Sequence, residues 1–273
     1  MPASLPVVLS IAGSDNSAGA GAQADLKTMS ALGVYGVTAI TCVVAEVPGR
    51  VSAIQPIEAR IVAEQIRLLF RAFPVAALKT GMLYSRALIA QVCDTLEECF
   101  AREARRPFLV VDPVMVASSG DPLLEPDAIE LYKARLFPLA GVVTPNLDEA
   151  GTLLGRSITS LAELRVAGEE LVALHGTAFL LKGAHLRQAM ATDLLFSKGF
   201  AQEFTAPFVP NVSTHGTGCT YSAAIAAGVG RGLGLPEAVA EAKGFVTRSI
   251  TEYLEWERPA GRTHALHHFA PRG

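Results

Sequence analysis

The sequence is poor in aromatic residues, charged residues and cysteine. Of its 273 residues, 7% are aromatic, 18% are charged and four are cysteines. These cysteines show neither a Cys-x-x-Cys pair nor a regular disulfide spacing, which excludes a disulfide-stapled scaffold. The 23 basic and 26 acidic side chains leave a net charge of −3, without the basic surplus of a dedicated nucleic-acid-binding protein.

Long hydrophobic runs are also lacking, although half of the residues are hydrophobic. Two stretches, 28–45 and 204–230, contain no Asp, Glu, Lys or Arg, but glycines, prolines and polar residues interrupt both. Neither is the continuous apolar run of ~20 residues that a membrane helix needs. No basic region precedes the first apolar segment, as it does in a signal peptide. We therefore expect a cytoplasmic protein with no membrane or nucleic-acid partner.

Apolar runs alternate with amphipathic segments along the whole chain. Alternating β and α units predict a mostly parallel sheet with helices on both faces, which is a three-layer α/β/α domain. No linker divides the chain, so we expect one domain over residues 1–273, with a flexible tail from about 258. The expected strands are Val7–Ala12, Val37–Val44, Ala76–Lys79, Phe108–Asp112, Val142–Thr144, Ala178–Leu181 and Leu194–Ser197. The expected helices are Gly21–Leu32, Ala59–Ala72, Ser85–Arg105, Pro126–Phe137, Leu147–Leu154, Ser160–His175, Gly218–Gly230 and Pro236–Tyr253.

Ligands of such sheets bind beyond the carboxyl ends of the strands. Here several expected strands run directly into polar or glycine-rich residues, at 13–15, 112–114, 144–146 and 182–183. We therefore look for the chemistry of this protein at that edge of the sheet.

The sharpest motif is the Gly-Thr-Gly-Cys segment Gly216–Cys219, after which a small-residue helix begins. Unpaired N–H groups at such a helix start, together with the helix dipole, form an anion site. Cys219 falls in the first turn, where its thiolate is favoured and its pKa can fall. A glycine turn with a buried structural cysteine is the alternative. Neither GxxxxGK[ST] nor a GxGxxG after a strand is present.

Carboxylates and a lysine follow other strands. Asp112 and the segment Thr144–Glu149 come after buried strands, where Mg²⁺ binding or helix capping by Asp112 or Asn146 would satisfy them. Lys182 ends another strand and is either a phosphate ligand or a surface lysine. Near the N-terminus, a glycine loop leads to Asp25, a candidate hydrogen-bond acceptor, although a capped turn has the same pattern.

Two further cysteines, the tail histidines and the tryptophan are interpreted as structural or solvated side chains. Cys93 and Cys99 are interpreted as core or surface thiols. The histidines of the tail, His264, His267 and His268, are interpreted as solvated rather than metal-binding. Trp256 is expected to pack against a helix end.

Taken in order, these segments resemble the hydroxymethylpyrimidine/phosphomethylpyrimidine kinases of thiamine biosynthesis, which belong to the ribokinase-like superfamily. Each motif is weak alone, but the ordered set, from Ile11 to about Tyr253, is specific. The segments that carry the resemblance are 12–15, 21–28, Lys79–Met82, Asp112–Met115, Ser119–Leu124, Thr144–Glu149 and Gly216–Thr220.

The resemblance implies a ribokinase-like fold, a homodimer and phosphoryl transfer from ATP with Mg²⁺ to a hydroxymethyl group on a small aminopyrimidine, then to its monophosphate. Cys219 is then the catalytic residue, and the amides of Gly216, Thr217 and Gly218 help to hold the γ-phosphoryl group. The resemblance further implies Mg²⁺ at Asp112 and Glu149, ATP at Asn146, Lys182 and Lys243, and the pyrimidine at Gly13, Asp25, Met82 and Val114.

One departure concerns the substrate. The family commonly has glutamine where this chain has Glu46. An amide both donates and accepts hydrogen bonds, whereas an ionised carboxylate only accepts. Glu46 therefore binds the exocyclic amine alone, pairs with a protonated ring, or signals another pyrimidine or a pyridoxal-type substrate. The stretch 46–51 is also expected to form a lid or hairpin.

Three alternatives to this kinase remain. The nearest is a pyridoxal/pyridoxine kinase of the same fold. A cysteine hydrolase or acyltransferase would use Cys219 with His215, but no orienting acid is evident in the sequence. A non-catalytic nucleotide-binding protein would bind ATP without turnover.

Overall fold

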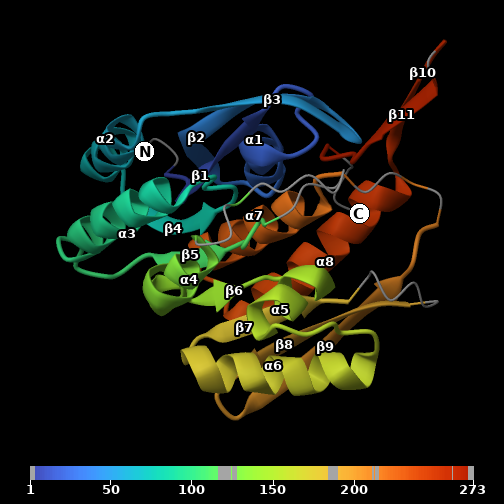
Figure 1. The fold of residues 1–273 in the computed structure, drawn as a ribbon. Helices are drawn as coiled ribbons and strands as arrows, with labels where there is room; N and C mark the ends of the chain where they lie inside the picture. The colour runs from blue at the N-terminus through green and yellow to red at the C-terminus, as the bar shows by residue number, and fades with distance from the viewer. Residues whose placement is uncertain are drawn as a thin grey trace.

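The computed structural model describes residues 4–115, 124, 128–183, 190–210, 212, 215–259 and 261–269. A central sheet of nine strands runs through this part of the chain (Figure 1). Its strands are β1 (Val7–Asp15), β2 (Tyr35–Val47), β3 (Arg50–Pro56), β4 (Val75–Thr80), β5 (Phe108–Val111), β6 (Val142–Val143), β7 (Ala178–Lys182), β8 (Met190–Ser197) and β9 (Phe200–Pro207).

The spatial order of the strands is β3-β2-β1-β4-β5-β6-β7-β8-β9. From β2 to β7 neighbouring strands run parallel, whereas β3, β8 and β9 are added antiparallel at the two edges. The prediction of a mostly parallel sheet is confirmed. Because the parallel strands end at the same edge, the residues that follow them are gathered there.

Successive residues of the parallel strands face opposite layers. In β1, Leu9 and Ile11 belong to one apolar cluster and Val8 to the other. In β7, Phe179 and Leu181 join the first cluster, and Leu180 joins the second. Both faces of the sheet are thus buried, which explains why these strands appear as continuous apolar runs.

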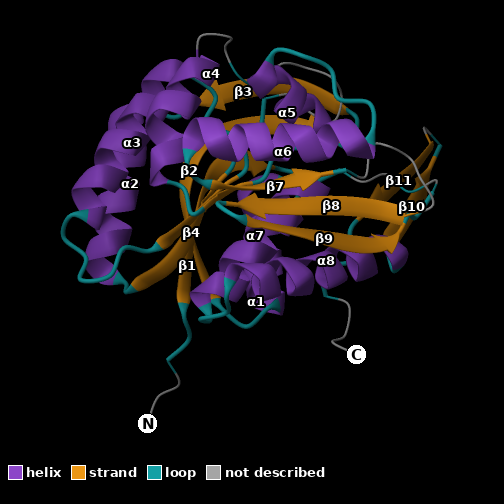
Figure 2. Cartoon of the chain, turned by 90° about the horizontal axis from the view of Figure 1, so that it is seen from below, coloured by secondary structure: helices purple, strands orange, loops and turns teal. Residues whose placement is uncertain are grey.

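Helices cover both faces, as Figure 2 shows. The larger cluster lies under α2 (Ala59–Ala72), α3 (Arg86–Phe100), α4 (Ala128–Leu131), α5 (Leu147–Leu154) and α6 (Leu161–His175). The other face carries α1 (Gly21–Ala31), α7 (Thr217–Gly230) and α8 (Leu235–Thr251). The expected three-layer α/β/α arrangement is confirmed. No helix in the described part is long and apolar enough to cross a membrane.

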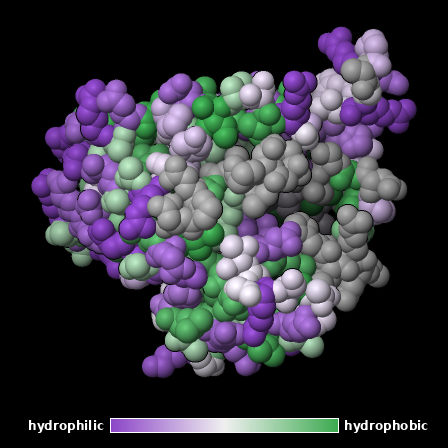
Figure 3. Space-filling model, in the orientation of Figure 1, coloured by the Kyte–Doolittle hydropathy of each residue, from purple (hydrophilic) through white to green (hydrophobic). Residues whose placement is uncertain are grey.

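The helix boundaries follow from local chemistry. The Ser160 hydroxyl accepts a hydrogen bond from the backbone N–H of Glu163 and caps α6. Gly155 ends α5 with a φ of 69°, a conformation that favours glycine. The outer surface of α2 and α3 is largely hydrophilic in Figure 3, as expected for helices that bury one face only.

The helix predicted over Pro126–Phe137 is different in the structure. Pro126 and Asp127 lie outside the described residues, α4 has only four residues, and a π-helical turn follows at Tyr132–Leu136. A 3₁₀ turn then ends the segment at Phe137–Leu139. Pro138 has no N–H to donate, so a regular α-helix is unfavourable there.

Two edge strands of the central sheet were not predicted from the sequence. Strands β3 and β9 are exposed along much of their length, so they lack the apolar run that marks a buried strand. The turn between β2 and β3 pairs Val47 with Arg50, which confirms the expected hairpin.

The C-terminal segment contains two strands that the sequence did not predict. Strands β10 (Leu254–Arg258) and β11 (Gly261–Ala265) pair antiparallel and project from the main body in Figure 1. Trp256 lies on β10 with 52% of its surface exposed, so the expected packing against a helix end is wrong. His268, expected to be solvated, is buried, and its Nε2 lies 3.0 Å from the Thr220 hydroxyl.

Candidate active site

A pocket of about 1040 Å³ lies at the carboxyl ends of the parallel strands. All but one of the predicted site residues line it, and they come from segments far apart in the sequence. Asp25 is the exception, and the roles of the others remain predictions. The lining includes Gly13, Glu46, Met82, Asp112, Val114, Asn146, Glu149, Lys182, Gly216, Thr217, Gly218, Cys219 and Lys243.

The first turn of α7, where the sequence predicts an anion site, lies on the pocket wall. Gly216 precedes the helix with a φ of 82°, and a Cβ atom there would collide with the carbonyl oxygen of Gly19. Glycine is therefore required at this position. The N–H groups at a helix start and the positive end of the helix dipole favour a phosphate, and α7 starts at the pocket wall.

The expectation of a low pKa for Cys219 is wrong. Desolvation raises the pKa of its thiol to about 11, and the negative charges of Asp25 and Asp112 act in the same direction. The Lys79 ammonium and a hydrogen bond with the Gly21 backbone oppose them. Position in a first helical turn is thus outweighed by removal from water and by nearby carboxylates.

Asp25 lies behind the pocket. Its carboxylate is fully buried, accepts hydrogen bonds from Lys79 Nζ at 2.9 Å on both oxygens, and accepts a third from the Ser10 hydroxyl. The predicted contact of Asp25 with a pyrimidine is therefore not supported. The pair joins α1 to β4, and Lys79 interacts electrostatically with Cys219 and Asp112.

Asp112 and Lys182 meet beside the anion site. Lys182 Nζ donates to Asp112 Oδ1 at 3.0 Å, and the Thr144 hydroxyl donates to the same oxygen at 3.2 Å. A Cβ atom on Gly218 would lie 3.3 Å from Lys182 Nζ and 3.5 Å from Asp112 Oδ2. A cation and a carboxylate thus stand directly against the first turn of α7.

Glu149 and Asn146 form a capping box at the start of α5. Asn146 Oδ1 accepts from the Glu149 N–H at 2.9 Å, and Glu149 Oε2 accepts from the Asn146 N–H at 2.8 Å. Capping by Asn146, one of the two structural alternatives, is confirmed. Desolvation raises the pKa of Glu149, the Lys182 ammonium lowers it, and the Asp112 carboxylate raises it. Two buried carboxylates of this kind fit a divalent cation that prefers oxygen ligands.

Lys243 is also held in a pair. Its Nζ donates to Asp193 Oδ2 at 2.6 Å, and Asp193 Oδ1 accepts from the Gly183 N–H at 3.1 Å. Asp193 lines the pocket and was missed by sequence reasoning. In the sequence, Asp193 stands out only as a charged residue directly before the apolar run Leu194–Phe196. In the structure, it pairs across the sheet with Lys182 of β7.

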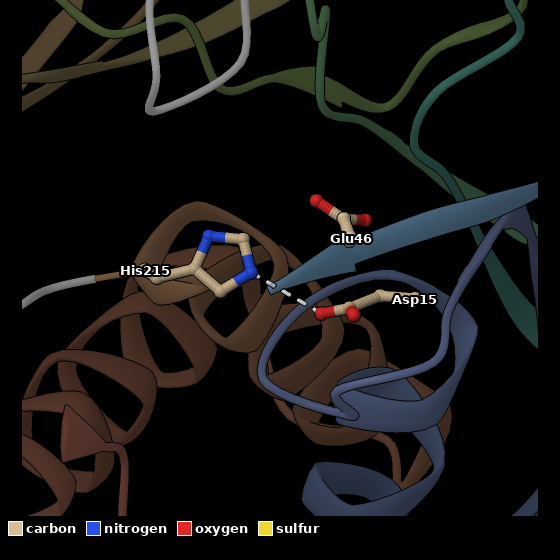
Figure 4. A group of neighbouring side chains, drawn as sticks. All are labelled: Asp15, Glu46 and His215. Carbon is tan, nitrogen blue, oxygen red and sulfur yellow. Dashed lines mark hydrogen bonds and ion pairs between the residues drawn. The ribbon is translucent and has the colours of Figure 1, made fainter. Parts of the chain in front are cut away.

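Three side chains from β1, β2 and the segment before α7 converge at another part of the pocket (Figure 4). His215 Nε2 lies 3.2 Å from Asp15 Oδ2, and one ligand atom each from Asp15, Glu46 and His215 lies within 4.8 Å of the others. Hydrogen bonds lower the pKa of Asp15 to about 2 despite its burial. The hydrogen bond with Asp15 raises the pKa of His215, against its desolvation.

This arrangement argues against a cysteine hydrolase. An acid that orients His215 does exist, contrary to expectation, but it binds Nε2. Nδ1 is buried without a hydrogen-bond partner among the described residues. A thiol with a pKa of about 11 does not form the thiolate–imidazolium pair of such enzymes.

Two further cysteines, and the one described residue of a further motif, lie outside the pocket lining. Cys93 and Cys99 are buried in the core, as one of their two interpretations predicted. Of the motif Ser119–Leu124, only Leu124 lies within the described residues, and it is buried.

A family model and curated relatives that match this chain share the description of a phosphomethylpyrimidine kinase. A family model described as phosphomethylpyrimidine kinase matches residues 15–264. A hydroxymethylpyrimidine/phosphomethylpyrimidine kinase of Rhizobium meliloti is 45% identical over 264 residues, which covers 96% of this chain and 97% of the relative. The enzyme of the same description from Escherichia coli is 39% identical over 262 residues, covering 95% and 97%.

Solved structures include two related activities. A Bacillus subtilis pyridoxal kinase in complex with ADP has a TM-score of 0.87 and 33% identity, with 98% of each chain covered. A phosphomethylpyrimidine kinase from Clostridium difficile has a TM-score of 0.76 and 37% identity, covering 90% of this chain and 98% of the other.

The buried Asp25–Lys79 pair predicts a stability effect that depends on which partner is removed. Lys79→Met leaves Asp25 unpaired in the interior and is expected to reduce the free energy of unfolding by about 3–5 kcal/mol. Adding Asp25→Leu removes the orphaned carboxylate and is expected to restore about 2 kcal/mol or more. Urea denaturation at pH 7 measures both. Arg71→Met, which breaks an exposed pair with Glu64, is the control and is expected to cost less than about 1 kcal/mol. A double variant no more stable than Lys79→Met would contradict this account.

The raised pKa of Cys219 predicts slow alkylation at neutral pH. The thiolate is the nucleophile, so the iodoacetamide rate at Cys219 should rise about tenfold per pH unit from pH 7 to pH 10. Site-resolved mass spectrometry separates Cys219 from the buried Cys42, Cys93 and Cys99, and glutathione is the reference thiol. A rate that is already constant from pH 7 upward is incompatible with the structure.

Proposed function

The chain belongs to the phosphomethylpyrimidine kinase family, and from that premise we propose its reaction. It transfers the γ-phosphoryl group of ATP to the hydroxymethyl oxygen of 4-amino-5-hydroxymethyl-2-methylpyrimidine, and then a second one to the monophosphate, in thiamine biosynthesis. The observation that carries the proposal is the pocket in which the Gly216–Cys219 turn stands against Lys182 and Asp112.

The first turn of α7 holds the group in transfer. Phosphoryl transfer has little covalent chemistry for a protein to perform, so catalysis rests on position and on stabilisation of charge. The amides of Thr217, Gly218 and Cys219 point where charge develops on the γ-phosphoryl oxygens. Lys182, beside Gly218, neutralises a phosphate oxygen.

Cys219 acts on the hydroxyl proton of the pyrimidine. Its thiol is protonated at neutral pH because its pKa is about 11, so the thiolate has to form in the substrate complex. The Lys79 ammonium behind the pocket already favours that thiolate. Cys219 first gives its own proton to solvent, and the thiolate then takes the proton of the hydroxymethyl group. The hydroxymethyl oxygen bonds to the γ-phosphorus as the bond from that phosphorus to the leaving oxygen of ADP breaks.

Mg²⁺ fits the two carboxylates near the first turn of α7, Asp112 and Glu149. Asp112 and Glu149 are buried, line the pocket and repel each other, so a divalent cation between them would offset that repulsion. When bound, Mg²⁺ supplies positive charge to the phosphates of ATP. Asp112 and Glu149 hold it, directly or through water, and Asn146 lies near the phosphates.

The remaining parts of the pocket bind the two substrates. Lys243 and Asp193 lie at the α8 side, where the resemblance implies the nucleotide. Gly13, Met82 and Val114 bind the pyrimidine ring.

We also include a homodimer and a cytoplasmic location in this proposal. The first rests on the family resemblance, and the four free thiols support the second.

A pyridoxal kinase is the second candidate. The observation that favours it is the TM-score of 0.87 with the Bacillus subtilis pyridoxal kinase. Both reactions phosphorylate a hydroxymethyl group on a nitrogen heterocycle, so the choice rests on the ring.

A substrate panel tests the proposal. Purified protein with ATP and Mg²⁺ is expected to convert the hydroxymethylpyrimidine to its mono- and diphosphate, followed by mass spectrometry, with a higher kcat/KM than for pyridoxine. Cys219→Ala is expected to lower kcat by about 10²- to 10⁴-fold, with ATP affinity by calorimetry unchanged.

Cys93→Ala, on the opposite side of the sheet, is the control for removal of a thiol. Absence of pyrimidine phosphates would refute the kinase assignment. A strong preference for pyridoxine would select the second candidate. Full turnover by Cys219→Ala would remove Cys219 from the mechanism.

A further inference from the structure

Glu46 is a carboxylate on the pocket wall that accepts no hydrogen bond within the described residues. Its backbone N–H donates to the Asn16 side chain at 2.7 Å, which fixes the main chain of β2 at this point. The side chain is half-buried and lines the pocket. Desolvation and the charge of Asp15 raise the pKa of Glu46, and His215 lowers it. Partial burial weakens the hydration of this carboxylate, so a ligand that donates a hydrogen bond to it would be favoured.

The two neighbours of Glu46 are already committed to each other. Asp15 Oδ2 accepts from the Ser17 hydroxyl and from the N–H groups of Gly19 and Ala20 at 2.7 to 3.1 Å. The same oxygen meets His215 Nε2, and Oδ1 accepts from the Ser17 N–H at 2.7 Å. Asp15 is therefore a fixed anion, and His215 is held against it. Among these three residues, Glu46 is the one that can change its hydrogen bonding.

The same three residues have the composition of a metal site, but Asp15 makes a poor ligand. A metal would have to displace donors from an oxygen that already accepts several hydrogen bonds. The lone pairs that a cation needs are in use. The geometry thus favours an organic ligand at Glu46 over a cation.

We propose that Glu46 binds the edge of the substrate ring on which an exocyclic amino group adjoins a ring nitrogen, with one proton shared between the carboxyl group and that nitrogen. This inference rests on the proposed kinase function and specifies how its ring is selected. The hydroxymethyl group has to reach Cys219, four residues beyond His215, so the ring lies in the adjacent part of the pocket lined by Gly13, Met82 and Glu46.

The chemistry of the edge explains the shared proton. The amino group donates and the ring nitrogen accepts, so the complementary partner has to accept and donate side by side. A carboxylic acid does this, and a carboxylate facing a protonated ring forms the same pair. In either form the complex holds one proton that neither free partner holds at high pH. Binding of the pyrimidine is therefore linked to proton uptake.

A glutamine at this position would make both hydrogen bonds without a proton. Glu46→Gln is thus expected to bind the pyrimidine with no proton uptake, whereas the apolar Glu46→Leu loses both hydrogen bonds. The carboxylate also disfavours a ring that presents an exocyclic oxyanion at this edge, as pyridoxine does, and the amide removes that repulsion.

Calorimetry without ATP tests the linkage, because neither nucleotide nor catalysis then contributes to the pH dependence. Binding of the hydroxymethylpyrimidine is measured at pH 7, 8 and 9 in buffers with different ionisation enthalpies. For the wild type we expect uptake of about one proton at the higher pH values and a Kd that rises up to about tenfold per pH unit. For Glu46→Gln we expect little uptake and a nearly flat Kd, and for Glu46→Leu a Kd about 10- to 100-fold weaker.

The other ionisable groups near Glu46 are Asp15, His215 and Cys42, with Arg50 on the wall of the same pocket. Proton uptake that persists in Glu46→Gln would belong to one of them and would overturn the inference. Glu169→Gln, exposed on α6, is the matched control and is expected to behave as the wild type.

Kinetics add an independent measurement. Relative to the pyrimidine, kcat/KM for pyridoxine is expected to rise about tenfold or more in Glu46→Gln. If the wild type phosphorylates the pyrimidine while Glu46→Gln leaves this ratio and the proton uptake unchanged, the inference is wrong and the kinase function stands. If the wild type neither binds nor phosphorylates the pyrimidine, both fail. Tight binding of Zn²⁺ that excludes the pyrimidine and is lost in Glu46→Gln would overturn the inference in favour of a metal site.

Discussion

The pairing of buried charges is the constraint on which the pocket depends. A carboxylate or ammonium group removed from water is stable only with a partner, and here each partner comes from a different element of the fold. These pairs therefore fix the elements relative to one another at the edge of the sheet where the pocket lies. They join α1 to β4 (Asp25–Lys79), the residue after β5 to β7 (Asp112–Lys182), β8 to α8 (Asp193–Lys243) and β1 to the segment before α7 (Asp15–His215).

The same constraint explains how a chain with a net charge of −3 can accept a polyanionic nucleotide. Net charge describes the whole surface, whereas the phosphates would meet the amides of the first α7 turn and the Lys182 ammonium. Lys182 is bound to Asp112 in the absence of ligands. A phosphate and a cation entering together exchange this internal pair for two new ones, so no charge is left without a partner at any stage.

Much of the fold follows from the sequence because the parallel strands are buried on both faces. Segments such as Phe179–Leu181 contain only apolar residues, which marks them as strands buried on both faces. The residues that follow such strands are brought together because the parallel strands end at the same edge of the sheet. Exposed elements gave no such signal, which is why β9 and the C-terminal hairpin were missed. The predicted site residues on strand ends line one pocket for the same topological reason, and their roles remain predictions. The pairing of Asp25 was not predicted, because sequence does not show that Lys79 lies across from it. The pKa of Cys219 was misjudged because burial depends on all surrounding elements, not on its position in a helix.

The central claim is that the first turn of α7, the carboxylates of Asp112 and Glu149, and the side chain of Glu46 serve a single reaction centre. A crystal structure with the hydroxymethylpyrimidine, Mg²⁺ and a non-hydrolysable ATP analogue tests it most directly. The account predicts the γ-phosphate at the amides of Gly216–Cys219, Mg²⁺ beside Asp112 and Glu149, and the amino edge of the ring at Glu46. A γ-phosphate bound away from the α7 turn, or a ring that turns its amino edge away from Glu46, would contradict it.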